Sequence, residues 1–346
     1  MKRLFAALLI VSLLGTSLTG CGKSSVSEEA SSAPAPSDSS SSEASNTQSD
    51  LIPFKAAFCT WAGYAPLFIA KEKGYFAEKG YDCEIIIMED ESTYGAAFVS
   101  DSIQMLGQVL DRDIIQYGAG APEQYVCTMD CSTGGDGLVA TAEIQSVDDL
   151  AGKTVALDKS ATSYFFFLQI LADSNITEDE INIVEMGNDE AGQAFIAGQV
   201  DAAITWEPAL SNCGEREGGH ILVSSADYPK AIIDVLTVSS TFAEKHPDFY
   251  DVAEECWYQA VDYLNENFEG GCAIMAKGLD LEVEDVKAEC SGITFYGREE
   301  NAAFNDLNAE DNIKDIAQMA AGFWVEKDLM EHDDLTGFFP TLDTNQ

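Results

Sequence analysis

From residue 54 onward, short apolar runs of strand length alternate with stretches of helical periodicity. Strands that alternate with helices are typical of βαβ units, in which helices cover a mostly parallel sheet. The sequence therefore predicts an α/β fold with mainly parallel sheets. The strands are expected at Phe54–Thr60, Cys83–Met88, Lys153–Leu157, Ile181–Val184 and Asp201–Thr205, and the helices from Pro66, at Tyr164–Ala172 and at Glu190–Ala197.

The last third of the chain is expected to be helical, with one long helix from Pro247 through Phe268 and a final helix at Asn312–Met330. A helix-rich end of this kind can return to cover the first α/β unit. Asn188 and Asp189 are expected to cap the helix that follows them, and Gly198 is expected to end it.

The turns that follow the predicted strands are the expected places for a ligand. In parallel sheets, ligands bind beyond the carboxyl ends of the strands, where helix N-termini present free N–H groups. Two α/β units that face each other would enclose a cleft able to close about hinges. The turns concerned are Trp61–Tyr64, Ser160–Ser163, Gly187–Asp189 and Trp206–Pro208.

The N-terminus has the pattern of an export signal. Met1-Lys2-Arg3 is positively charged, Leu4–Leu14 is apolar but too short to span a bilayer, and Leu18-Thr19-Gly20-Cys21 follows. This run resembles a bacterial lipobox, which implies cleavage after residue 20 and diacylation of Cys21. Ordinary signal cleavage, with Cys21 incidental, is the alternative. Residues 22–50 are Ser-rich and predict a disordered tether. We therefore expect a lipid-anchored protein on the extracytoplasmic face of the cell membrane.

Charge and metal-ligand spacing exclude several functions. Lys+Arg number 18 against 60 Asp+Glu, a formal net charge of −42, which argues against nucleic acid as a partner. The three histidines are scattered and no C-x-x-C pair occurs, so neither a zinc site nor a cofactor is expected. Cys127 and Cys131 lie in one extended segment, too far apart for a disulfide.

Three segments, taken together, resemble the solute-binding proteins of nitrate, sulfonate and taurine ABC importers, a family that includes binders of thiamine-precursor pyrimidines. The segments are Gly63–Phe76, Asp148–Val155 and Ala197–Leu210. The resemblance implies a periplasmic-binding-protein type II fold. Lobe 1 would comprise 51–145 plus 240–346, lobe 2 would comprise 146–239, and the two crossovers would act as hinges. It also implies a monomer that delivers its solute to permease transmembrane subunits and their ATPase.

Each candidate ligand-binding residue also has a purely structural interpretation. Aromatic side chains can be core, hydroxyls can be helix caps, and Gly198 and Asp201 are assigned to structure alone. The hypothesis that Trp61 and Glu207 line the cleft from opposite lobes rests on their positions at strand ends. The candidates are Trp61, Gly63, Tyr64, Asp111, Asp136, Ser160, Thr162, Ser163, Asn188, Trp206 and Glu207.

Three functions remain open at this point: a transport receptor, an enzyme and a surface interaction protein. A pyrimidine synthase of thiamine biosynthesis shares the implied fold, but the chain lacks the cysteine-rich iron motif of that enzyme. An enzyme is therefore not expected. The solute could be a sulfonate or taurine-like compound. The acidic candidates and the absence of a lysine or arginine among them favour an amine or a nitrogen-containing ring.

Overall fold

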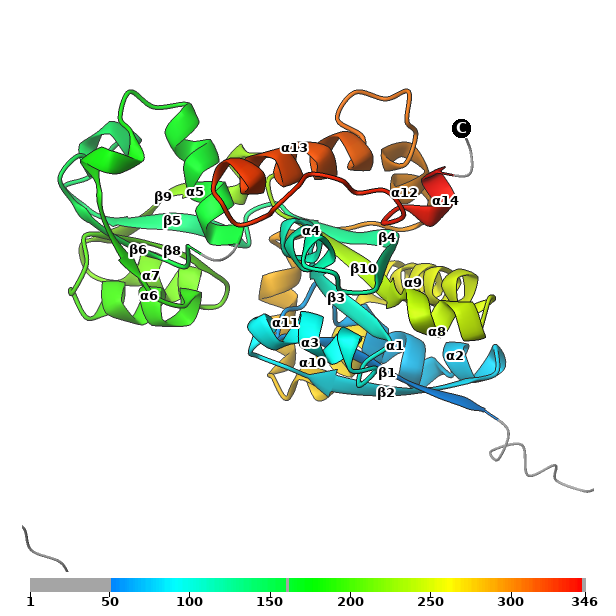
Figure 1. Cartoon of the computed structure of the whole chain (residues 1–346). Helices are drawn as coiled ribbons and strands as arrows, with labels where there is room; N and C mark the ends of the chain where they lie inside the picture. Colours follow the sequence, from blue (N-terminus) through cyan, green and yellow to red (C-terminus); the bar gives the residue numbers. More distant parts are fainter. Residues whose placement is uncertain (1–50, 160–161, 344–346) are drawn as a thin grey trace, which may run out of the picture. The chain divides into compact units, whose positions relative to one another are not determined.

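The computed structural model describes residues 51–159 and 162–343, which belong to one compact unit. Apolar runs form two separate sheets within it (Figure 1). The first has the order β11-β4-β10-β3-β1-β2 and the second the order β7-β6-β8-β5-β9. The first sheet contains β1 (Ile52–Phe58), β2 (Tyr81–Ile87), β3 (Met105–Val109), β4 (Glu123–Ser132), β10 (Ile233–Ser239) and β11 (Ile293–Phe295). The second contains β5 (Asp136–Thr141), β6 (Thr154–Leu157), β7 (Asn182–Glu185), β8 (Ala202–Trp206) and β9 (Gly219–Ser224).

Both sheets are mixed, with two parallel pairings out of five in the first and two out of four in the second, so the expectation of mainly parallel sheets is wrong in part. β1 runs parallel to β2 and β3, and β6 runs parallel to β7 and β8. By contrast, β10 is antiparallel to β3 and β4, and β5 is antiparallel to β8 and β9. Strands β5 and β10 are those by which the chain enters each sheet from the other one, and β11, which is antiparallel to β4, is a third reversed strand.

The chain passes from the first sheet to the second between β4 and β5 and returns between β9 and β10. These passages lie at residues 133–135 and 225–232, whereas the sequence places the lobe boundaries near 146 and 239. Strand β5 therefore belongs to the second sheet and β10 to the first. The helical pattern of the sequence locates these lobe boundaries poorly, because at each crossing the chain enters the next sheet directly as a strand and not as a helix.

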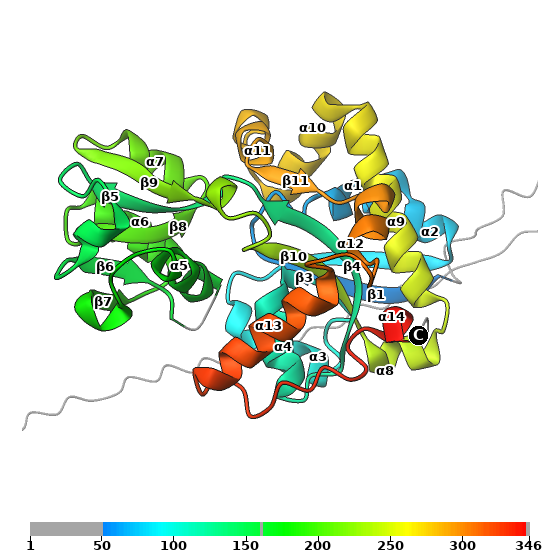
Figure 2. The ribbon, with the colours of Figure 1, turned by 90° about the horizontal axis from the view of Figure 1, so that it is seen from above.

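Helices cover both faces of the sheets (Figures 1 and 2). One face of the first sheet packs on α1, α9 and α10, and the other face packs on α3 and α4. The second sheet lies between α5 on one face and α6 with α7 on the other. The bounds are α1 (Pro66–Lys73), α2 (Tyr75–Glu78), α3 (Tyr94–Val99), α4 (Leu110–Gly118), α5 (Thr162–Ala172), α6 (Asn188–Ile196) and α7 (Ala209–Glu215).

The C-terminal part is helical, as predicted; the long helix α9 matches its predicted bounds to within two residues, and a separate helix follows it directly. Asn267 leaves the helical conformation, and its side chain accepts a hydrogen bond from the Gly270 N–H to start a new helix. The last long helix begins after Asn312, whose side chain accepts from the Lys314 and Asp315 N–H groups. The bounds are α8 (Ser240–Lys245), α9 (Phe249–Glu266), α10 (Phe268–Leu279), α11 (Val283–Cys290), α12 (Arg298–Phe304), α13 (Ile313–Glu326) and α14 (Pro340–Asp343).

Helix α13 joins the two sheet systems. It packs on α4, which follows the first sheet's β3, and its Phe323 and Trp324 also contact Phe165 of α5 with ring centroids 5.1 and 6.1 Å apart. Lys327 reaches Glu178 of the second system at 3.6 Å. These contacts form one apolar core that spans both sheet systems.

The eight cysteines of the described part are buried and unbonded. No helix within residues 51–159 and 162–343 combines the length and the apolar character needed to cross a bilayer. Cys21 and the predicted signal and tether lie outside the described residues.

Candidate ligand-binding site

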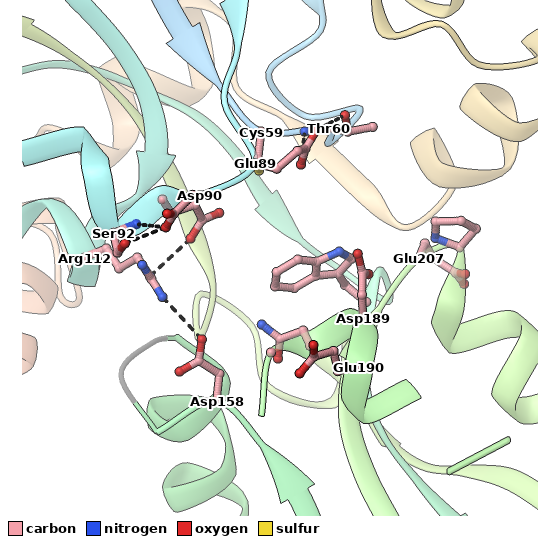
Figure 3. A pocket seen from close by; sticks show the side chains of 15 residues that line it. Cys59, Thr60, Glu89, Asp90, Ser92, Arg112, Asp158, Asp189, Glu190 and Glu207 are labelled. Atoms are coloured by element: carbon pink, nitrogen blue, oxygen red, sulfur yellow. Dashed lines mark hydrogen bonds and ion pairs between the residues drawn. The ribbon is translucent and has the colours of Figure 1, made fainter. Parts of the chain in front are cut away.

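A cavity of about 580 Å³ opens where the strand ends of the two sheets meet (Figure 3). Its walls are the segments that follow β1, β2, β6, β7 and β8, together with Arg112 on α4. This is the edge at which the strand-end argument places a ligand. The first system contributes Cys59, Thr60, Glu89, Asp90, Glu91, Ser92 and Arg112, and the second contributes Asp158, Gly187, Asn188, Asp189, Glu190, Trp206, Glu207 and Pro208.

A smaller and more apolar cavity of about 40 Å³ adjoins the first and shares Cys59, Glu91 and Trp206 with it. Its remaining lining residues are Trp61, Tyr64, Val109, Asp136, Ile232 and Asp234. Three aromatic side chains and two buried aspartates thus surround a space that holds only a few atoms. We call this space the inner pocket.

Asp234 organises the inner pocket. One of its oxygens accepts a hydrogen bond from the Trp61 indole Nε1 at 3.0 Å, and the other accepts from the Tyr64 hydroxyl at 2.5 Å. The carboxylate is 1% exposed and so depends on these donors for its solvation. The aromatic wall is therefore held in place by the acid that it surrounds.

Asp130 of β4 lies directly opposite Asp234 in the sheet register and is completely buried. Like charges at paired positions repel each other, and burial raises the pKa of both carboxyl groups, that of Asp130 well above its usual range. Asp234 is the better-solvated partner because Tyr64 and Trp61 donate to it. Burial therefore favours the protonated form more strongly at Asp130 than at Asp234.

Asp136 begins β5 and lies opposite Trp206 in the register of the second sheet. Burial raises the pKa of its carboxyl group to about 7, although the Ser132 hydroxyl donates to it and lowers the pKa. Asp234 and Glu207 add repulsion that acts in the same direction as burial. No arginine or lysine lines the inner pocket, so no fixed cation offsets these charges.

Arg112 is the single lysine or arginine among the described residues that line the two cavities. Its guanidinium group lies 3.2 Å from a Glu91 oxygen and 3.5 Å from an Asp158 oxygen on the opposite wall. Figure 3 shows Arg112 and Asp158 directed toward each other across the cavity. This cation therefore links the two walls.

The structure brings six of the candidate residues to the cavities. Trp61, Tyr64 and Asp136 line the inner pocket, Asn188 and Glu207 line the larger cavity, and Trp206 lines both. The Glu207 carboxylate accepts hydrogen bonds from the backbone N–H and the hydroxyl of Ser211 at 3.1 and 2.7 Å. It thus serves the start of α7 as well as the cavity wall.

Four other candidates lie beside the cavities and do not line them. Thr162 donates to Asp111 at 2.8 Å, which joins α5 to α4, and Ser163 donates to Asn188. Gly63 lies against Trp61 and Asp130, where a side chain would clash. The expected cap at Asn188 is also wrong, because the N-cap of α6 is Gly187. Ser160 lies outside the described residues.

Sequence reasoning missed Asp234 and the acidic segment after β2. Asp234 was visible as the lone charge in the apolar run Ala231–Leu236, a pattern that marks a buried charge with a specific environment. Glu89, Asp90 and Glu91 follow a predicted strand in the same way as the chosen turns do. No three His, Cys, Asp or Glu side chains in the described part are grouped to hold a metal ion.

Comparison with known proteins gives one consistent result. A family model described as NMT1/THI5 like matches residues 61–267. The chain is 26% identical over 291 residues to a putative aliphatic sulfonates-binding protein of Bacillus subtilis (strain 168), covering 78% of this chain and 86% of that protein. It is 30% identical over 115 residues to the taurine-binding periplasmic protein of Escherichia coli (strain K12), covering 33% and 36% of the two chains.

Solved structures share the arrangement of the two sheets. The periplasmic aliphatic sulphonate binding protein SsuA from Escherichia coli superposes with a TM-score of 0.68 at 18% identity, covering 81% of this chain and 89% of that one. At that identity the similarity establishes the fold, and the predicted periplasmic-binding-protein architecture is confirmed.

Proposed function

Because the chain belongs to the NMT1/THI5-like family, we propose that it captures a small organic solute outside the cytoplasm and delivers it to the permease of an ABC importer. The single observation that carries this proposal is the cavity of about 580 Å³ walled by the strand ends of both sheets. A volume of this size suits a small molecule. The relatives named above are binding proteins, which supports capture without chemical change.

The proposal includes closure of the cleft around the solute. Two chain crossings connect the sheets, and the Arg112–Asp158 ion pair already reaches across the cavity, while the Thr162–Asp111 hydrogen bond joins the two sheet systems beside it. A solute that contacts both walls would favour the closed arrangement by its differential affinity for that state. The two sheet systems would then move as two bodies, with the crossings at residues 133–135 and 225–232 as hinges.

The proposed location follows from the N-terminal pattern. Diacylated Cys21 would hold the protein at the outer face of the membrane, and residues 22–50 would let the binding unit reach the permease. The protein would act there as a monomer beside the transmembrane subunits and their ATPase.

A solute library tests the proposed function. Sulfonates, taurine, amines and nitrogen heterocycles, including a thiamine-precursor pyrimidine, would be screened by thermal shift, since a ligand that binds only the native state raises Tm. Calorimetry would then give Kd, and small-angle scattering should show a smaller radius of gyration at saturation. Mass spectrometry should recover the solute unchanged. A library without a single binder, or a solute that is chemically converted, would contradict the proposal.

A further inference from the structure

We infer that the solute is a compact organic cation, with its N–H donors on Asp136 in the inner pocket and its flat or apolar part against Trp61 and Trp206. This inference rests on the proposed function and assigns a chemical class to the solute. Three features carry it: the charge of the cavity walls, the acids and engaged hydroxyls at the helix starts where an anion could otherwise bind, and the composition of the inner pocket.

The charge of the walls is strongly one-sided. The larger cavity is lined by Glu89, Asp90, Glu91, Asp158, Asp189, Glu190 and Glu207. The inner pocket adds two further acids, Asp136 and Asp234. Arg112 is the one lysine or arginine among the described residues that line the cavities with these nine carboxyl groups, and it is already paired with two of them. A solute that enters this space is therefore surrounded by negative charge.

The elements that could hold an anion are either opposed by acids or already hydrogen-bonded. The N-terminus of α6 faces the cavity without a side-chain cap, but its first turn carries Asp189 and Glu190, whose negative charges would oppose an anion bound there. At the start of α5, the Thr162 hydroxyl donates to Asp111 and the Ser163 hydroxyl donates to Asn188. A sulfonate or carboxylate would therefore gain no free hydroxyl donor from Thr162 or Ser163, and at the start of α6 it would face two carboxylates.

The inner pocket complements a positive charge. Asp136 is desolvated, receives one hydroxyl from Ser132 and faces no protein cation, so a ligand N–H⁺ would supply its missing partner. Trp61, Tyr64 and Trp206 surround the same space. Aromatic faces attract cations, and their surfaces also suit a planar ring. The small volume admits a charged head group and leaves the rest of the molecule to the larger cavity.

Proton linkage gives this inference a distinctive signature. A bound cation stabilises ionised Asp136 and Asp234, so binding should release protons and should strengthen as the pH rises from about 5 to about 8. An anion would show the opposite dependence. The titratable groups that face these two acids are Asp130 on β4, Glu91 after β2, Glu207 after β8, Tyr64 before α1 and Cys59 after β1.

Three probes of one size separate the alternatives. Benzamidine is a planar cation with N–H donors, benzamide is its neutral counterpart and benzenesulfonate is an anion. Each would be titrated at the same concentrations by thermal shift and calorimetry. Benzamidine should raise Tm and should bind at least tenfold more tightly than the other two. Tighter binding of benzenesulfonate or taurine overturns the inference but leaves the proposed function standing. If none of the three probes binds, the cation class is rejected. The proposed function would be rejected as well only if no compound of the solute library binds.

Substitutions locate the effect. Asp136→Asn keeps the shape of the side chain and removes its charge, so it should weaken benzamidine binding by roughly tenfold to a hundredfold and reduce the pH dependence. Asp113→Asn is the control, because Asp113 on α4 is also a buried aspartate but lines neither cavity. Wild-type affinity in Asp136→Asn, or equal losses in both variants, contradicts the assignment. Far-UV circular dichroism would check that each variant is folded.

Discussion

The hydrogen bonds to Asp234 connect packing with recognition at the scale of single residues. Trp61 and Tyr64 each donate a hydrogen bond to this carboxylate, and both side chains line the inner pocket. A hydrogen bond to a charged group typically contributes about 1.5–3 kcal/mol. Asp234 thus fixes the orientation of the two rings that a solute would contact.

Trp61→Phe should therefore lower the free energy of unfolding by at least about 1.5 kcal/mol, because it leaves one oxygen of a buried carboxylate without its donor. Trp206→Phe is the matched control, since the described residues contain no hydrogen bond from the Trp206 indole. Urea denaturation of both variants at one pH would measure the difference. Equal losses would show that ring size, and not the hydrogen bond, accounts for the effect.

The sequence predicted part of this site for a physical reason. Strand ends identify the edge of a sheet where side chains gather, which is why Trp61, Trp206 and Glu207 were found. The rule does not tell in which direction a side chain points. Thr162 and Asp111 consequently turn toward each other, outside both cavities. Register pairs such as Asp130 with Asp234 depend on strands a hundred residues apart and cannot be read from local pattern.

At the scale of elements, the turn between β1 and α1 is the most tightly constrained segment of the site. A Cβ atom on Gly63 would lie 2.2 Å from an Asp130 oxygen and 2.3 Å from the Trp61 indole nitrogen. Both neighbours are buried and hold the inner pocket together. The glycine is therefore needed for close approach of the turn to β4.

Gly63→Ala should destabilise the protein by about 1–3 kcal/mol, because the added methyl group overpacks this contact. It should also shift tryptophan fluorescence through displacement of Trp61. Gly322→Ala in α13 meets no atom within 4 Å and should instead stabilise the protein by about 0.5–1 kcal/mol, as expected within a helix. Urea unfolding of the pair provides the measurement, and a neutral Gly63→Ala would refute the packing argument.

Local signals located most elements but not their pairing. Apolar runs and caps identified β1, β2 and α13 to within a few residues. Strands β5 and β10 were not predicted, and antiparallel entry from another sheet leaves no trace in a single run of residues. The end of α9 was predicted to within two residues, at Phe268.

At the scale of the whole molecule, buried acids make stability depend on pH. Burial raises the pKa of Asp136 and of Glu289 to about 7 and that of Asp111 to about 6. Between pH 4 and pH 8 the folded chain thus holds protons that the unfolded chain has lost. The free energy of unfolding must fall as the pH rises through this range. The net charge of −42 acts in the same direction through self-repulsion.

We therefore expect the ligand-free protein to be more stable at pH 5 than at pH 8, by on the order of a few kcal/mol. Urea denaturation across this range measures the slope, and urea avoids the screening that guanidinium salts would introduce. Asp136→Asn should make the free energy of unfolding less dependent on pH, because it removes one carboxyl group with a raised pKa. A stability that increases from pH 5 to pH 8 would contradict the burial argument.

The proposed anchor makes a prediction for the complete protein in a cell. Cys21→Ala removes the only residue that could be diacylated in the predicted signal, so the variant should leave the membrane fraction or remain unprocessed. Fractionation with mass spectrometry of the mature N-terminus would follow both outcomes. A wild-type N-terminus that begins at another residue and carries no acyl group would disprove the assignment.

Helix α13 has a consequence for how long a solute stays bound. Any opening that separates α5 from α4 must also part Phe165 from Phe323 and Trp324, although these rings touch neither cavity. Contacts that break only on opening act on the dissociation rate and leave the encounter rate nearly unchanged. The residence time of the solute would then be set partly by the C-terminal helix, and two proteins with identical pockets could release their solutes at different speeds.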